Sequence, residues 1–210
     1  ATEKSHRDVS AFIVERDWSG ITIGKKEDKM GQRASDCAQI IFEDVKIPRN
    51  SLLGSEGSAF KIAMKVFDRS RPVVATTAVG VGRRAMEHAI EYARQRKSFG
   101  REIFNHQAIA FKIADMAMQV SAARLLSWHA AWLADNGMSN TKEAAFAKAY
   151  AADTCLQITS EAVQVFGGYG YMKDYPVEKL MRDAKGIQIY EGTSEIQRLI
   201  ISKEIFQSHQ

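Results

Sequence analysis

The chain has 210 residues, 45% apolar and 26% charged, so it can bury a sizeable core as one large domain or one and a half small ones. Its net charge of +4 is modest and not concentrated in Lys/Arg blocks, which argues against a nucleic-acid-binding arm and favours a small anionic partner. The two cysteines are too few for a disulfide framework, the histidines lack metal-ligand spacing, and no run of about 18 apolar residues indicates a membrane span.

The N-terminal quarter of the chain has the pattern of β-strands. Residues 10–16 (SAFIVER) alternate apolar and polar side chains, and a turn at 17–20 leads to a second candidate strand at 21–26. Residues 37–47 form a third candidate. Three strands make a poor sheet on their own because their edges stay open. We therefore interpret residues 1–54 as the last part of a β domain whose beginning lies outside this chain.

From about residue 57 the apolar period becomes helical. Pro72 interrupts this pattern, and we expect it in the first turn of a new helix, with Ser70 as the cap. A short helix is expected after Pro176. The longer helices are expected at 73–96, 106–135 and 142–166. Long helices joined by short loops predict an antiparallel bundle, so the fold class is mainly α, with residues 55–210 as a helical-bundle domain.

Some side chains inside this pattern carry structural expectations of their own. Asn105 is placed to cap the helix that begins near residue 106. The methionines within 115–120 (DMAMQV) could suggest a cofactor box, but at helical spacing we interpret them as core filler. Trp128 and Trp132 lie four residues apart on one helix face, so we expect both in the core.

Two stretches combine charged residues with a helix end. Residues 67–72 (FDRSRP) place Asp68 and Arg71 beside the expected helix junction, where a capped helix start with a surface ion pair is the simpler interpretation. Residues 93–100 (ARQRKSFG) end a long helix with cations, which is favourable in any helix. A binding role would require a phosphate within reach of Arg96, whose planar guanidinium suits bidentate contact.

A third stretch, residues 164–171 (QVFGGYGY), ends a helix with paired glycines. A C-cap followed by a turn explains Gly167 and Gly168 without any ligand. The functional alternative is a close approach of backbone to a flat or phosphate-bearing ligand, which glycine permits. No strand precedes the stretch, so it is not a Rossmann dinucleotide site.

The fourth stretch, residues 189–206 (IYEGTSEIQRLIISKEIF), opens with a carboxylate that no helix cap requires. Ser194 and Gln197 have the spacing of a capping box, which leaves Glu191 unexplained. Gly192 removes the next side chain, so a ligand can approach the backbone and the free N–H groups of the following helix. Beside a ligand that excludes water, a carboxylate has a raised pKa and can abstract a weakly acidic C–H proton.

Taken together, the order and the amino-acid sequences of these stretches resemble the acyl-CoA dehydrogenase family over nearly the whole chain. Residues before 55, with KMGQRASD at 29–36, resemble the end of that family's middle β domain. These sequence motifs are most similar to those of the medium-chain branch, with the short-chain branch second. The segments that resemble the family's C-terminal helical domain are RPVVATTAVGVGRRAMEHAIEYARQRKSFG, HQAIAFKIADMAMQV, QVFGGYGY, PVEKLMRDAK and IYEGTSEIQRLI.

The resemblance implies an FAD-dependent enzyme of fatty acid β-oxidation. Such an enzyme oxidises an acyl-CoA, here expected to be of medium chain length, to the trans-2-enoyl-CoA and passes electrons to electron-transfer flavoprotein. Glu191 would be the base, and its backbone N–H would hold the thioester carbonyl. Substrate contacts are implied for Asp68, Arg71, Tyr190 and Gly192. Cofactor contacts are implied for Arg96, Ser98, Phe99, Gln107, Gln164, Gly167, Gly168, Thr193 and Glu195, some of them to the FAD of a neighbouring subunit.

Some positions depart from the family pattern. Some branches of the family place the base on the helix that contains residues 67–72 (FDRSRP). There this chain offers only Ser70 and Gly80, neither of them acidic, which favours Glu191. Lys203 stands where the medium-chain branch is expected to have an arginine, and Glu195 is more typical of the short-chain branch. The resemblance also implies a homo-oligomer, a dimer of dimers, in the mitochondrial matrix or in bacterial cytoplasm. We expect this chain, as a C-terminal fragment, to be inactive alone.

Other classes of protein remain as alternatives. A non-enzymatic relative that serves as an assembly factor or scaffold would not need Glu191, Arg71 and Arg96 together. A DNA-associated relative would need a strongly basic face, which a net charge of +4 does not favour. An acyl-CoA oxidase would share the fold, and no residue here distinguishes it from a dehydrogenase.

Overall fold

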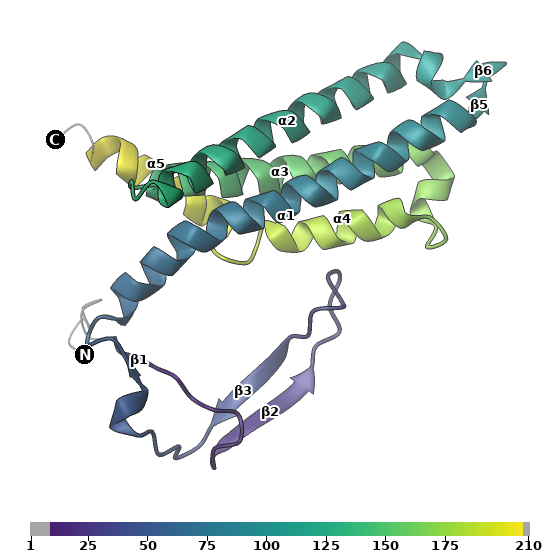
Figure 1. Cartoon of the computed structure of the whole chain (residues 1–210). Helices are drawn as coiled ribbons and strands as arrows, with labels where there is room; N and C mark the ends of the chain where they lie inside the picture. Colours follow the sequence, from purple (N-terminus) through teal and green to yellow (C-terminus); the bar gives the residue numbers. More distant parts are fainter. Residues whose placement is uncertain (1–8, 208–210) are drawn as a thin grey trace. The chain divides into compact units, whose positions relative to one another are not determined.

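The computed structural model describes residues 9–207, which divide into two compact units (Figure 1). The first unit contains the described residues up to Lys29 together with Arg33–Phe67. The second contains Met30–Gln32 and the chain from Asp68 onward. The division along the chain falls between Phe67 and Asp68, inside the helix that spans Ala59–Gln95. The domain boundary expected after residue 54 stays a prediction.

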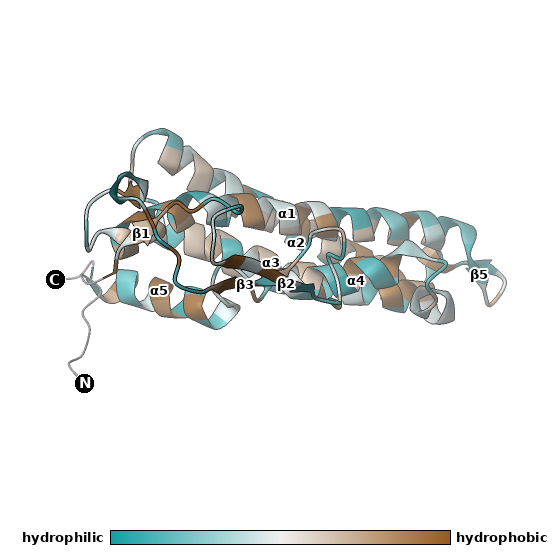
Figure 2. Cartoon of the chain, turned by 90° about the horizontal axis from the view of Figure 1, so that it is seen from below, coloured by the Kyte–Doolittle hydropathy of each residue, from teal (hydrophilic) through white to brown (hydrophobic). Residues whose placement is uncertain are grey.

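The first unit contains short antiparallel ribbons. Strand β1 (Ala11–Phe12) pairs with β4 (Leu52–Leu53), and β2 (Ile21–Lys26) pairs with β3 (Ala38–Phe42), while a 3₁₀ turn, η2 (Arg49–Ser51), precedes β4. The first and third strands are thus shorter than expected. Figure 2 shows apolar residues along β2 and β3 in brown, several of them exposed. A two-stranded ribbon buries little of each strand, so its apolar residues do not form a core.

The second unit is a helical bundle, which confirms the expected mainly α fold. Its helices are α1 (Ala59–Gln95, of which the part from Asp68 onward belongs to this unit), α2 (Gln107–Asp135), α3 (Thr141–Phe166), α4 (Pro176–Ile187) and α5 (Ser194–Gln207). The short connectors are β5 (Lys97–Ser98), β6 (Arg101–Glu102), η3 (Ile103–Asn105) and η4 (Gly167–Tyr171). Helix α3 contacts α2, α4 and α5 (Figure 1).

The expected helix break at Pro72 is wrong, because α1 runs through it without interruption. An internal proline costs a helix about 3 kcal/mol, and here the buried apolar face of α1 offsets that cost. The Thr76 hydroxyl donates to the Pro72 carbonyl (2.9 Å). Ser70 therefore caps nothing. The cap assigned to Asn105 is also wrong, since His106 occupies the N-cap position and the Asn105 amide lies 3.4 Å from a Glu102 carboxylate oxygen.

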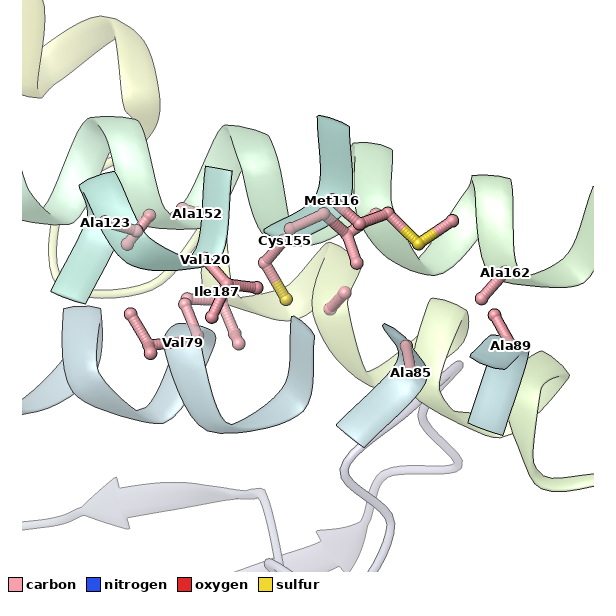
Figure 3. Close-up of a cluster of buried hydrophobic side chains, with 14 of the residues drawn as sticks. Val79, Ala85, Ala89, Met116, Val120, Ala123, Ala152, Cys155, Ala162 and Ile187 are labelled. Carbon is pink, nitrogen blue, oxygen red and sulfur yellow. The ribbon is translucent and has the colours of Figure 1, made fainter. Parts of the chain in front are cut away.

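The core of the bundle is built largely from alanine, with a few larger side chains between the helices (Figure 3). Ala85 and Ala89 of α1, Ala162 of α3, and Met116 and Val120 of α2 are all buried. The small alanine side chains among them let the helix backbones approach closely. As a result, any added carbon at the seam must displace a neighbouring helix.

The expectation that Trp128 and Trp132 lie in the core is wrong, since they are 60% and 55% exposed. The buried face of α2 follows a four-three spacing that these positions do not share. The residues of that face are Met116, Val120, Ala123, Ser127 and Ala130. Core filling by the methionines is confirmed only for Met116, because Met118 is exposed.

The two cysteines differ in accessibility, which leads to a labelling prediction. Cys37 is exposed, whereas Cys155 is buried in the bundle, and burial raises the pKa of the Cys155 thiol to about 12. The thiolate is the nucleophile, so iodoacetamide is expected to alkylate Cys37 and spare Cys155 in the native protein. Peptide mass spectrometry before and after unfolding in urea checks this. Native labelling of Cys155 at the rate of Cys37 would contradict the packing described.

Candidate active site

The turn between α4 and α5 holds its backbone in an unusual conformation. Glu191 (φ 54°) and Gly192 (φ 92°) both have positive φ, which a residue other than glycine rarely adopts. A Cβ on Gly192 would also lie 2.7 Å from the Gln197 amide nitrogen. The positive φ favours glycine at position 192, and an added Cβ there would also displace the Gln197 amide, while Glu191 is held in a strained conformation by its surroundings.

The Glu191 side chain turns toward α1 and is partly buried. Its Oε2 accepts a hydrogen bond from the Ser70 hydroxyl (2.7 Å), although the two residues are far apart in sequence. Among the described residues, no acceptor binds the backbone N–H of Glu191. One residue thus offers a carboxylate and a backbone donor, the pair of groups needed to deprotonate a carbon beside a carbonyl.

The pair Asp68 and Arg71 belongs to the same region and is not a surface ion pair. Arg71 is only 4% exposed, and its guanidinium lies 3.6 Å from an Asp68 carboxylate oxygen. Burial lowers the pKa of Arg71, although the charges of Asp68 and Glu191 oppose this effect. The Thr141 hydroxyl donates to Asp68 (2.8 Å), and Asn140 donates to the Asp68 carbonyl (2.8 Å). A buried cation is therefore fixed close to Glu191.

The capping box expected for the last helix does not form. Gln197 is fully buried and donates from Nε2 to the carbonyls of Glu191 (3.2 Å) and Gly192 (3.0 Å). The N-terminal cap is Thr193, whose hydroxyl accepts from the Ile196 N–H (3.3 Å). Gln197 thus stabilises the turn at Glu191 instead of the helix end.

Two residues on α3, neither of them expected from the sequence, complete this support. The Lys148 ammonium donates to the Gly192 carbonyl (2.5 Å). The Asp153 carboxylate accepts from Ser194 (2.7 Å) and Gln188 (2.7 Å). A lysine inside the apolar run AAFAKAYAA was a usable signal, because lysine is almost never fully buried without a partner.

Tyr190 faces the short segment Met30–Gln32 of the same unit. The Gln32 amide donates to the Tyr190 hydroxyl (3.4 Å) and to the Asp183 carbonyl (3.0 Å). A Cβ on Gly31 would lie only 2.3 Å from the Arg182 carbonyl oxygen, so glycine is required there. The segment thereby lies against α4 beside the turn.

A cavity of about 410 Å³ adjoins the turn on the side of α5. Thr193 and Glu195, both expected to contact a cofactor, line this cavity together with Asp153, Lys185 and Arg198. Arg198 donates to Asp153 (2.7 Å). The cavity is therefore polar and edged by charges of both signs.

The Asp153 cluster leads to a prediction on acid stability. Burial raises the pKa of Asp153, but hydrogen bonds from Arg198, Ser194 and Gln188 outweigh it, so the pKa lies below the usual value of 3.8. A lowered folded-state pKa stabilises the fold above the unfolded pKa, and that contribution is lost as pH falls through the folded pKa. Asp153→Asn should therefore be less stable than wild type at pH 7, with a difference that shrinks below about pH 4.

Urea unfolding midpoints of wild type and Asp153→Asn, measured at pH 7 and below about pH 4, give the difference in stability. Asp135→Asn is the matched control, because Asp135 is exposed at the end of α2. A gap between wild type and Asp153→Asn that stays constant across the acid range would contradict the assignment.

A second cavity, of about 640 Å³, lies at the other end of the bundle, where α1 and α3 end. Arg96 lines it, with its guanidinium 5.9 Å from the centre of the Tyr169 ring. Gly167 has φ 60°, and a Cβ there or on Gly168 would meet no atom within 4 Å. Ser98 also lines it, as does Phe99, which is 97% exposed.

Most of the residues expected to bind a cofactor through the loops after α1 and α3 thus share this second cavity. Gln107 and Gln164 do not line it and are exposed on α2 and α3. Within the described residues, no cluster of three or more His, Cys, Asp or Glu side chains could hold a metal ion. In the same part of the chain, no helix has the length and apolar character needed to cross a membrane.

The two regions are far apart in one chain (Figure 1). Arg71 lies near the turn that carries Glu191, and Arg96 follows the last residue of α1, so the helix rise of 1.5 Å per residue separates the two arginines by about 38 Å. The candidate base and the second cavity therefore cannot contact the same small group within one copy of the chain.

Comparisons with known proteins agree with this arrangement of motifs. The family model described as acyl-CoA dehydrogenase, C-terminal domain, matches residues 57–206. An acyl-CoA dehydrogenase of Bacillus subtilis is 51% identical over 203 residues, which are 97% of this chain and 54% of the relative. The bovine mitochondrial short-chain specific acyl-CoA dehydrogenase is 47% identical over 211 residues, which are 100% of this chain and 51% of the relative.

Among solved structures, butyryl-CoA dehydrogenase from Megasphaera elsdenii is similar, with a TM-score of 0.95 and 46% identity over 98% of this chain and 54% of that one. The chain thus spans about half the length of the relatives it matches. The bovine short-chain specific enzyme and the butyryl-CoA dehydrogenase both indicate the short-chain branch. This corrects the expectation that the medium-chain branch is closest. From residue 57 to residue 206 the match is to one domain of one family. The chain belongs to the acyl-CoA dehydrogenase family and contains its C-terminal domain.

Proposed function

We propose that this chain is part of an FAD-dependent acyl-CoA dehydrogenase that uses Glu191 to deprotonate the α-carbon of a short-chain acyl-CoA. The observation that carries the proposal is the position of Glu191. Its carboxylate is fixed by Ser70 beside a buried arginine, on a turn where Gly192 leaves space for a ligand. A scaffold protein would gain nothing from a strained glutamate held in this way.

The chemistry divides between two groups of Glu191. The backbone N–H is free to donate to the thioester carbonyl, which stabilises negative charge developing on that oxygen. The carboxylate takes the α-proton, while Ser70 fixes its orientation through Oε2. FAD, when bound, would accept the β-hydrogen as hydride. Proton and hydride leave neighbouring carbons, so the product is the trans-2-enoyl-CoA.

Tyr190, Gly192, Asp68 and Arg71 are proposed to surround the thioester and the adjoining part of CoA. Arg71 is a buried cation near the turn, held in place by Asp68. The two residues are therefore proposed to border the thioester from the side of α1.

The second cavity fits the phosphate-bearing part of FAD. Arg96 offers a planar, bidentate donor, and Gly167 and Gly168 expose backbone that no Cβ covers. Ser98 and Phe99 complete the loop that faces the cavity. Thr193 and Glu195 in the smaller cavity, and the exposed Gln107 and Gln164, remain proposed cofactor contacts.

The distance of about 38 Å along α1 supports an oligomer. It exceeds the reach of one extended dinucleotide, so an FAD bound near Arg96 would serve the Glu191 turn of another copy. We propose a homo-oligomer on this basis, with a dimer of dimers as the arrangement that the sequence resemblance implies. Electron-transfer flavoprotein is the proposed electron acceptor. The named relatives include a bovine mitochondrial enzyme and a bacterial enzyme, and either compartment fits.

The test is reduction of bound FAD by acyl-CoA substrates in the full-length protein. Butyryl-CoA, octanoyl-CoA and palmitoyl-CoA are mixed anaerobically with the enzyme, and loss of flavin absorbance is followed. We expect butyryl-CoA to react fastest. Failure of every acyl-CoA to reduce the flavin would refute the function, and a preference for octanoyl-CoA would refute the short-chain assignment. Rapid reoxidation by oxygen instead of by electron-transfer flavoprotein would identify an oxidase.

A further inference from the structure

Lys148 is fully buried, yet it carries an ammonium group. It lies on α3 among alanines, and Ala144, Ala147 and Ala151 on the same helix are all buried. Transfer of an ammonium from water into such surroundings is costly unless it is hydrogen-bonded or paired with charge. The position therefore requires an explanation that packing alone does not give.

The polar partner of Lys148 is the turn that carries the proposed base. Its Nζ donates to the Gly192 carbonyl (2.5 Å), which also accepts from Gln197 (3.0 Å). Gln197 binds the Glu191 carbonyl as well. Two successive carbonyls of the turn are thus held by two fully buried donors.

These hydrogen bonds hold the backbone of the turn next to Glu191, which has the strained conformation. Glu191 has φ 54°, a conformation that costs free energy and persists only where its surroundings enforce it. The direction of the Glu191 N–H and the start of its side chain both depend on that dihedral angle. Loss of the hydrogen bonds to the Gly192 carbonyl would let the turn relax. The Glu191 carboxylate and the Glu191 backbone N–H would then move together.

The charges around Lys148 match this role. Burial lowers the pKa of Lys148 and Arg71 adds to that effect, whereas Asp153, Glu191 and Glu195 oppose it. The ammonium is thus surrounded mainly by carboxylates that belong to the turn or support it.

We propose that Lys148 is a positioning residue for the Glu191 turn and acts through the Gly192 carbonyl to align base and thioester. The role in the reaction rests on the proposed dehydrogenase function, while the hold on the backbone can be tested without it. A misplacement of about 1 Å can cost about 100-fold in rate, which sets the size of the expected effect.

The test compares Lys148→Met with wild type in the full-length, FAD-loaded protein. Methionine is close to lysine in length, removes the buried charge, and leaves the Gly192 carbonyl bonded to Gln197, so the variant is expected to fold. We expect kcat with butyryl-CoA to fall by about 10- to 100-fold while KM changes little. Lys142→Met is the matched control, because Lys142 lies on the same helix outside the core.

A second readout does not depend on activity. Hydrogen exchange of backbone amides, measured by mass spectrometry without substrate, should speed up in peptides that cover residues 190–196 and stay unchanged in α2. Lys148→Gln, which keeps a neutral donor, should recover part of both effects and replaces the methionine variant if that one does not fold.

The outcomes separate the two claims. Unchanged kcat and unchanged exchange in Lys148→Met overturn the role of Lys148, even if wild type oxidises acyl-CoA. Faster exchange with unchanged kcat also overturns it, because the turn would then be free to move without loss of rate. A wild-type protein that oxidises no acyl-CoA refutes the proposed function, and the exchange data then decide alone whether Lys148 holds the turn.

Discussion

Replacement of Glu191 by glutamine is expected to lower kcat with butyryl-CoA by about 10²- to 10⁴-fold, the usual contribution of a general base. Glutamine keeps the size of the side chain and an oxygen that can accept from Ser70, so the turn should stay in place. What it loses is the ability to accept a proton. Steady-state kinetics with an artificial electron acceptor measure the effect, and the KM for substrate should change much less than kcat.

The control for this experiment is Glu87→Gln. Glu87 lies on α1, where it forms surface ion pairs with Arg83 and Arg84 (3.4 and 3.3 Å). Exposed pairs of this kind contribute little, so the control should retain wild-type activity. Wild-type turnover in Glu191→Gln would mean that another group removes the proton.

The second large effect is expected on stability, at the seam between α1 and α3. Ala162 faces Ala89 there, and both are fully buried (Figure 3). Leucine at position 162 adds three carbon atoms to a seam that has no room for them. The added atoms force the helices apart or the leucine side chain out of a favourable rotamer. We expect Ala162→Leu to lower the free energy of unfolding by at least about 1–3 kcal/mol.

Urea denaturation followed by circular dichroism checks this expectation. Ala117→Leu is the matched control, because Ala117 is exposed on α2 and leucine is nearly as good a helix former as alanine. A leucine at 162 that costs no more than the one at 117 would show that the seam is looser than described.

The helical part of the fold was predictable because its apolar period is long and regular. The expected α2 and α3 agree with the structure to within one residue at each end. Pro72 misled the prediction, since a local rule against internal proline was overridden by burial of the helix around it. Trp128 misled it for a related reason: the buried face of α2 is defined by other positions, where alanine and serine occupy part of the seam and the tryptophan remains on the exposed side.

The candidate site was predictable only in part. Glu191 stood out because no helix cap requires a carboxylate at that position. Gly192 stood out because it removes the side chain next to Glu191 and so leaves space for a ligand. Lys148, Asp153 and Gln197 act on the turn from other helices or another helical face. Their roles depend on three-dimensional contacts, so spacing along the chain does not reveal them, although a lysine in an apolar run was a usable sign.

The most direct test of Glu191 as the base is exchange of the substrate α-hydrogen with solvent. The full-length enzyme is incubated in D₂O with an acyl-CoA whose β-carbon is replaced by sulfur, so that proton removal can occur but oxidation cannot. Nuclear magnetic resonance should show deuterium entering the α-position with wild type and with Glu87→Gln, and not with Glu191→Gln. Equal deuterium incorporation by wild type and Glu191→Gln would contradict the assignment of the base.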